Sequence, residues 1–219
     1  MESMELMRAR HSVRKYLDKP IETEKVTALQ KAVEEVNEAS GLSVQLFTEE
    51  PEAFEANAAH YGAFSGCRNY FALVGPADAD EAIGYYGEKL VLLAQELGLN
   101  TCWVVLTYKK GKVAVDPAKG EKLHGVIALG YGADQGREHF NKELETLAQL
   151  RPDDPEWYRR GLEAALLAPT AVNQQKFYIS REGDAVTAKA KMAFYAKMDL
   201  GIVKYHFEQG AGLENFHWA

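Results

Sequence analysis

Two arginines and a serine alternate near the start of the sequence, in the segment RHSVR at positions 10–14. In an extended backbone, residues two positions apart lie on the same face, so Arg10, Ser12 and Arg14 would share one. Guanidinium groups bind phosphate through paired, charge-assisted hydrogen bonds. The segment therefore predicts a small anion-binding face, and a solvated basic patch is the alternative interpretation.

A second group of polar residues stands where a predicted helix ends, in the run APTAVNQQ at positions 168–175. Pro169 must end the helix, because its ring clashes with the preceding turn and it has no N–H to donate. The polar groups of Thr170 and Asn173 can then point at a ligand. An ordinary helix end with polar turn residues is the alternative interpretation.

These two segments, and a third with the sequence ELGLNTCWV at positions 96–104, resemble motifs of the FMN-dependent nitroreductase family. ARHSVRKY is similar to the family's N-terminal flavin motif, and APTAVNQQ to its Ala-Pro-Ser turn. ELGLNTCWV is similar to its Gly-Leu-Gly-x-x-Trp segment. The resemblance covers nearly the whole chain and implies a nitroreductase-like fold with non-covalently bound FMN.

The resemblance implies that Arg10 and Ser12 bind the phosphate or ribityl chain of FMN. It places Arg14 near N1 and the C2 carbonyl of the flavin, where a cation would stabilise the anionic reduced form. Lys142 falls at the position of a phosphate-binding lysine, although Phe140 replaces a residue that is frequently basic. The complete set of implied cofactor-binding residues is Arg10, His11, Ser12, Arg14, Leu99, Asn100, Thr101, Lys142, Pro169, Thr170, Ala171 and Asn173.

The third motif is expected to pass its backbone along one face of the flavin. Asn100 stands where the family commonly has a small residue, so the fit around the ring would differ. Trp103 is interpreted as a core-packing residue. The flavin would carry the chemistry, so no side chain is assigned as an acid or base and no metal ligand is expected.

Apolar periodicity predicts the elements that must position these motifs. Thr23 is the expected cap of the first long helix, and Gly98 the left-handed residue that ends the second. Helices are predicted at 23–39, 51–60, 81–97, 156–167 and 198–209, and strands at 44–48, 70–74, 101–107 (central), 125–129 and in a hairpin over 176–190. Their interleaving predicts an α+β fold with a central mixed sheet and packed helices.

A weak internal repeat accompanies this pattern. Residues 32–47 align without gaps with 162–177, and 93–103 resembles 207–218, although amphipathic helices also resemble one another by chance. The repeat predicts two halves, 1–150 and 151–219. This arrangement resembles a divergent branch of the nitroreductase family in which a single chain forms a pseudo-dimer. Because the arginine motif lies in one half and the proline turn in the other, we expect one FMN per chain between the halves, and a monomer would suffice.

Composition excludes several classes of function. The formal net charge of −7 argues against binding to nucleic acid or anionic membranes. Cys67 and Cys102 form no CxxC motif, the histidines are scattered, and HExxH, GxSxG and Walker motifs are missing. The N-terminal sequence carries charges and no apolar core, so no secretory signal is predicted and we expect a cytoplasmic protein.

The expected activity is transfer of hydride from NADH or NADPH to flavin N5, and then to a small acceptor such as a nitroaromatic or a quinone, in ping-pong order. A specialised flavin reaction, such as reductive dehalogenation or flavin breakdown, is also open. The rival from another class is a flavin-binding protein without turnover: a carrier, a sensor or a relic. Bulky aromatic residues could then fill the substrate cleft, with Tyr85, Tyr86, Phe194 and Tyr195 as the candidates.

Overall fold

The computed structural model describes residues 2–54 and 64–219, which divide into two compact units. The sheet unit consists of Arg10–Ala79 and Lys89–Glu138. The C-terminal unit consists of Met1–Ala9, Asp80–Glu88 and His139–Ala219. The duplication, and the boundary near residue 150, stay predictions.

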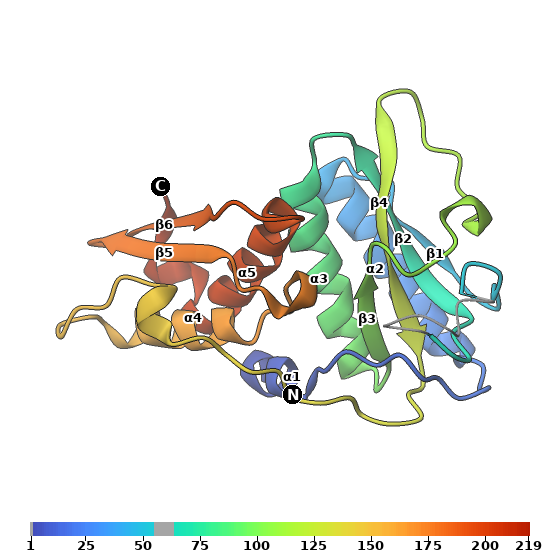
Figure 1. Ribbon diagram of the computed structural model, residues 1–219, viewed down its shortest axis with the longest axis horizontal. Helices are drawn as coiled ribbons and strands as arrows, with labels where there is room; N and C mark the ends of the chain where they lie inside the picture. Colours follow the sequence, from blue (N-terminus) through green and yellow to red (C-terminus); the bar gives the residue numbers. More distant parts are fainter. Residues whose placement is uncertain (1, 55–63) are drawn as a thin grey trace. The chain divides into compact units, whose positions relative to one another are not determined.

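The sheet unit is built on four strands in the order β1-β2-β4-β3, with every neighbouring pair antiparallel (Figure 1). Their bounds are β1 (Gln45–Phe47), β2 (Asn69–Pro76), β3 (Asn100–Val104) and β4 (Glu121–Gly130). The two inner strands, β2 and β4, are buried along almost their whole length, and each contains an apolar run, 70–74 in β2 and 126–129 in β4. The strands predicted at 44–48, 70–74 and 125–129 are therefore confirmed.

The prediction of a central strand over 101–107 is wrong in two respects. The strand ends at Val104, and it lies at the edge of the four-stranded sheet. All its residues except Trp103 are nevertheless buried, because the chain near Val13 covers the open edge. The Val13 N–H donates to the Thr101 carbonyl at 3.0 Å, and Thr101 is only 2% exposed.

The long helix α2 (Thr23–Ser40) confirms the helix predicted at 23–39 and buries Leu29, Val33 and Val36. The predicted cap is wrong. The residue before the helix is Glu22, while Thr23 is already helical.

Helix α3 (Asp80–Glu96) confirms the helix predicted at 81–97, and Gly98 has the predicted left-handed conformation with φ +75°. Of the short helix predicted at 51–60, residues 55–60 lie outside the described residues, and 52–54 form a turn. Short 3₁₀ turns occur at Lys110–Lys112, Leu144–Thr146, Ala171–Asn173 and Leu213–Asn215.

Besides the first half of α3, Asp80–Glu88, the C-terminal unit contains three helices and a small mixed sheet of order β5-β6-β7. The helices are α1 (Ser3–Ala9), α4 (Glu156–Leu166) and α5 (Ala196–Ala211), and the strands are β5 (Phe177–Glu182), β6 (Ala185–Ala190) and β7 (His217–Trp218). Helix α4, helix α5 and the hairpin confirm the corresponding predictions. The α+β class is confirmed, with the strands distributed over two sheets.

Helices α4 and α5 approach closely because glycines face the contact. A methyl group at Gly161 would lie 2.7 Å from the ring of Phe207, which is itself fully buried. This close packing fixes α5, and α5 in turn carries Asp199, which contacts one of the predicted site segments.

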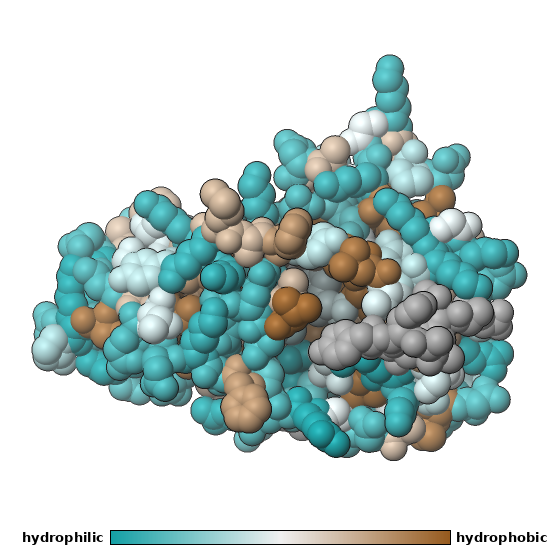
Figure 2. All heavy atoms as spheres, viewed as in Figure 1, coloured by the Kyte–Doolittle hydropathy of each residue, from teal (hydrophilic) through white to brown (hydrophobic). Residues whose placement is uncertain are grey.

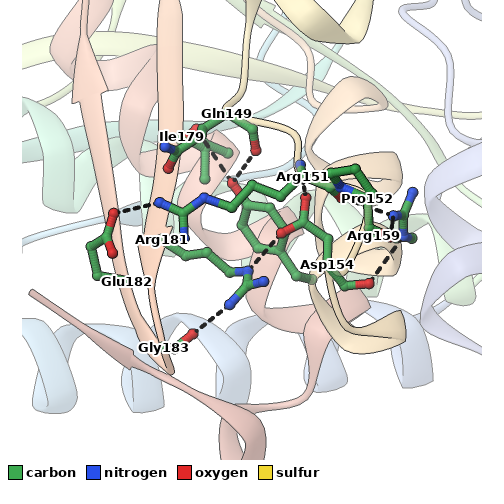
Figure 3. A network of polar contacts seen from close by, with 10 residues as sticks. Gln149, Arg151, Pro152, Asp154, Arg159, Ile179, Arg181, Glu182 and Gly183 are labelled. Atoms are coloured by element: carbon green, nitrogen blue, oxygen red, sulfur yellow. Dashed lines mark hydrogen bonds and ion pairs between the residues drawn. The ribbon is translucent and has the colours of Figure 1, made fainter.

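A polar network fixes the connection before α4 to the hairpin (Figure 3). Asp154 Oδ1 accepts a hydrogen bond from Arg181 Nε on β5 at 2.8 Å, and these side chains are 1% and 10% exposed. Asp154 Oδ2 accepts from the Arg151 N–H at 2.6 Å, and the Arg181 guanidinium lies 5.5 Å from the centre of the Tyr158 ring. The connection RPDDPEW at positions 151–157 is thus anchored to the hairpin through the buried side chain of Asp154.

The face of the molecule in Figure 2 is mostly hydrophilic and carries small, separate apolar patches. Within the described residues, no helix combines the length and the apolar character that a bilayer span requires. The same residues contain no group of three or more His, Cys, Asp or Glu side chains arranged to bind a metal ion.

Candidate functional site

The arginine segment of the sheet unit runs along the open edge of β3. Ser12 pairs with Thr101 in a parallel bridge, and Val13 between the two arginine-bearing positions is fully buried. Further on, Tyr16 bridges to Gly132. The segment therefore pairs with β3 at Ser12, and Val13 and Tyr16 are both buried.

Arg10, Ser12 and Arg14 gather around one buried thiol. The Ser12 hydroxyl is hydrogen-bonded to Cys102, and both arginines act on the same thiol electrostatically. Burial raises the pKa of Cys102, and the positive charges of Arg14 and Arg10 oppose that rise. Arg10 is only 3% exposed, while Arg14 is exposed. The structure thus places the three predicted side chains near one thiol, and we refer to them below as the positive face.

A glycine-containing loop at 130–136 presses against this segment. A methyl group at Gly136 would lie 2.7 Å from Cβ of His11, and the φ of Gly136 is +73°. A methyl group at Gly132 would lie 2.7 Å from Oδ1 of Asn100. The loop therefore supports the arginine segment, a role that sequence reasoning missed and for which the glycine spacing was the signal.

The side chain of Asn100 fixes that loop. Its Oδ1 accepts from the Gly132 N–H at 2.9 Å, and its Nδ2 donates to Gln135 Oε1 at 3.1 Å. Asn100 is 5% exposed, and the neighbouring Leu99 and Thr101 are 1% and 2% exposed. These three predicted cofactor residues thus direct their side chains into the protein. Trp103, interpreted as a core residue, is only partly buried.

The other predicted segment, the 168–175 turn, lies in the C-terminal unit. Helix α4 ends at Leu166, shortly before Pro169 as predicted. Three non-glycine residues then have left-handed backbones: Val172 with φ 45°, Asn173 with φ 54° and Gln175 with φ 42°. Such conformations cost about 1–3 kcal/mol each, and they cluster at functional sites. The turn is a strained structure rather than an ordinary helix end.

The polar side chains of the turn bond within the protein. Thr170 Oγ1 accepts from the Gln175 N–H at 3.0 Å, and Asn173 Nδ2 donates to the Phe140 carbonyl at 2.6 Å. The sequence predicted that these groups point at a ligand. In the structure they shape the turn, and the exposed part is Val172, at 90%.

Lys142 is brought to the same turn, which the sequence did not predict. Its Nζ donates to the Gln174 carbonyl at 2.6 Å, and its backbone N–H donates to Gln175 Oε1 at 2.7 Å. Lys142 also lines an open pocket of about 510 Å³. Two further lysines line that pocket, Lys176 and Lys191.

Asp199 on α5 is a residue of this site that sequence reasoning missed. Its Oδ1 accepts from the Ala171 N–H at 2.9 Å, and its Oδ2 accepts from Gln174 Nε2 at 2.7 Å. Burial raises its pKa to about 6. A lone acid within the apolar run MDLGIV was the available signal.

Comparison with protein families identifies one match, which spans residues 2–211 and is described as "putative TM nitroreductase". The chain belongs to this family. No curated protein matches the sequence. The resemblance that the three motifs carried is therefore confirmed at the level of the family.

Solved structures show the same fold. A nitroreductase-family structure from Thermotoga maritima has a TM-score of 0.67 at 20% identity, covering 96% of this chain and 83% of the other. One from Desulfovibrio desulfuricans, described as in complex with FMN, has a TM-score of 0.53 at 19% identity, covering 70% and 98%. A structure from Parabacteroides distasonis, described as NADH dehydrogenase/NAD(P)H nitroreductase, has a TM-score of 0.52 at 19% identity, covering 69% and 98%.

Proposed function

We propose that this nitroreductase-family protein is an FMN-dependent oxidoreductase that passes hydride from NADH or NADPH to a small acceptor. The observation that carries the proposal is the positive face of Arg10, Ser12 and Arg14, held on the edge of β3. The FMN named for the Desulfovibrio relative supports the choice of cofactor.

The donor set of this face fits FMN chemically. Arg10 and Ser12 offer N–H and O–H donors to a phosphate dianion or to the ribityl hydroxyls. The exposed guanidinium of Arg14 is available to the pyrimidine edge, where a cation favours the anionic reduced ring. The bound flavin supplies the hydride chemistry, and the protein supplies binding, orientation and electrostatics.

We also assign Lys142 and the turn residues Pro169, Thr170, Ala171 and Asn173 to the cofactor, with one FMN per chain. Because the side chains of Thr170 and Asn173 bond inside the protein, their contribution is the shape of the turn.

The proposed acceptors are nitroaromatics and quinones. Two phenyl rings beside the turn are exposed, Phe140 at 92% and Phe194 at 88%, and planar aromatic acceptors stack on such rings. Their backbone carbonyls bond to Asn173 and Gln174, which keeps both residues at the turn.

The test is an absorbance spectrum of the purified protein, followed by anaerobic addition of NADH or NADPH and mass identification of the released cofactor. FMN at about one per chain, bleached by either nucleotide, supports the oxidoreductase. Bound FMN that neither nucleotide bleaches supports the rival protein without turnover. A colourless protein that takes up no added FMN refutes the proposal.

A further inference from the structure

We propose that Asp199 is a positioning residue, whose carboxylate holds the 168–175 turn in the conformation that binds FMN. This inference rests on the proposed function, because it takes the turn as part of the cofactor site. Asp199 lies on α5, outside all three motif segments, and acts through the groups of the turn that it contacts.

The turn has a strained backbone, so contacts from outside the turn must stabilise it. Val172, Asn173 and Gln175 are all left-handed. For a β-branched residue such as Val172 this conformation is a genuine outlier. Strained residues persist only where the surrounding structure over-determines them. The contacts that hold this turn therefore control how often it has its observed shape.

One carboxylate spans the strained pair. The two groups that Asp199 binds, the Ala171 N–H and the Gln174 side-chain amide, lie on either side of Val172 and Asn173 along the chain. The same Gln174 amide also donates to the Phe194 carbonyl at 2.7 Å, so its donors are directed by two fixed acceptors. Both oxygens of Asp199 must accept, and only an ionised carboxylate has two acceptor oxygens and no proton.

Asp199 is 4% exposed, and the hydrogen bonds from Gln174 and Ala171 oppose the effect of burial on its charge. Four charged or titratable groups on α5, on the elements packed against it or at the turn have other partners. These pairs are Lys204 with Glu81, Glu208 with Tyr85, His206 with Glu88, and Lys142 with the Gln174 carbonyl.

Protonation would weaken the hold. Burial raises the pKa of Asp199 to about 6, so the carboxyl gains a proton as the pH falls below that value. The protonated oxygen then faces the donor of Ala171 or of Gln174, and one of the two bonds is lost. We expect the turn to leave its observed conformation more often in mildly acidic solution.

The central test compares Asp199→Asn with Glu208→Gln. Asp199→Asn keeps the side-chain size and replaces one acceptor by a donor. Glu208 is a matched control: a 7% exposed carboxylate on the same helix that accepts from Tyr85 at 2.5 Å and from Trp218 at 2.7 Å, away from the turn. FMN dissociation constants are measured by fluorescence titration of both variants and the wild type between pH 5 and 8.

We expect Asp199→Asn to bind FMN about tenfold more weakly at pH 7.5, because a tenfold smaller population of the competent turn raises the apparent dissociation constant tenfold. Glu208→Gln should match the wild type. The difference between wild type and Asp199→Asn should vanish as the pH falls below about 6. The phosphate of FMN itself titrates near pH 6, so the ratio between proteins at each pH is the decisive quantity.

A second variant, Gln174→Ala, tests the same contact if Asp199→Asn does not fold. Gln174→Ala removes the side-chain amide that donates to Asp199 Oδ2. If both residues act through one bond, the double variant should bind FMN no more weakly than the weaker single variant. Fully additive losses would overturn the shared role.

Amide hydrogen exchange separates the two proposals. We expect exchange at Ala171 to accelerate in Asp199→Asn, whether or not FMN is present. A wild-type protein that binds no FMN refutes the proposed function, whereas a protein that binds FMN equally in wild type and Asp199→Asn at every pH refutes the positioning role alone. Equal losses in Asp199→Asn and Glu208→Gln also overturn it, since that result indicates a general effect of buried charge.

Discussion

Replacing Asp154 by alanine should reveal how much stability the polar network of the C-terminal unit provides. The side chain of Asp154 is 1% exposed and accepts two hydrogen bonds, from Arg181 Nε at 2.8 Å and from the Arg151 N–H at 2.6 Å (Figure 3). Its removal leaves the guanidinium of Arg181, only 10% exposed, without its carboxylate partner. We expect this buried, unpaired charge to lower the free energy of unfolding.

Breaking a buried ion pair by removing one partner costs about 3–5 kcal/mol. For a protein of this size, each kcal/mol shifts the melting midpoint by about 2–4 °C, so a shift of roughly 10 °C is expected. The same network contains its own control, Glu182→Ala. Glu182 is 80% exposed and pairs with Arg151 at 2.6 Å, and solvent screens such a pair, so its loss should have little effect.

Urea unfolding, followed by circular dichroism and tryptophan fluorescence, measures both variants. The double variant Asp154→Ala, Arg181→Met should regain part of the loss, because it removes the buried charge together with its partner. Equal stabilities for Asp154→Ala and Glu182→Ala would refute the reasoning. That result would mean that burial does not determine the contribution of these ion pairs.

Three further predictions concern other parts of the molecule. Arg10→Ala should weaken FMN binding by roughly 1.5 to 3 kcal/mol, through loss of a charge-assisted contact; flavin titration measures this, with the exposed Arg8→Ala as the control. Gly136→Ala should lower the free energy of unfolding by about 1–2 kcal/mol, because φ is +73° there, and urea titration measures the change. Gly161→Ala should lower it by about 1–3 kcal/mol through overlap with Phe207, and an unchanged thermal midpoint would contradict the packing argument.

Helices were predictable from the sequence because their burial is periodic. Leu29, Val33 and Val36 are spaced for one face of α2, and that face is buried. Strand position was less predictable. An apolar strand has the same sequence pattern whether a second strand or an irregular segment covers its edge. The edge of β3 is covered by the chain near Val13.

The candidate site was predictable in its segments and less so in the roles of side chains. The extended arginine segment followed from its alternation. In contrast, Thr170 was expected to point at a ligand, but its hydroxyl accepts from the Gln175 N–H. The bonds of Asn100 to the distant loop at 132–135 were not predicted. No local preference predicts a left-handed valine, because tertiary contacts such as those of Asp199 impose it on Val172.

Burial of the Asp199 carboxylate should reduce stability at neutral pH. An unfolded aspartate titrates at the ordinary value of 3.8, whereas burial raises the folded pKa to about 6. The folded protein therefore binds more protons at Asp199 between these values, so the contribution of this group to stability is fully present below about pH 4 and is lost as the pH rises through about 6. At 1.36 kcal/mol for each unit of pKa, the loss is on the order of 3 kcal/mol.

Asp199→Asn removes this ionisation. At pH 7 the FMN-free variant should therefore be at least as stable as the wild type in urea, and its stability should vary less between pH 4 and 6. Together with its weaker FMN binding, this result would separate positioning from structural support, because a merely structural residue loses stability and binding together. A variant that is markedly less stable than the wild type at pH 7 would contradict the argument. Asp199 would then be a residue that stabilises the fold, and its effect on FMN binding would follow from that loss of stability.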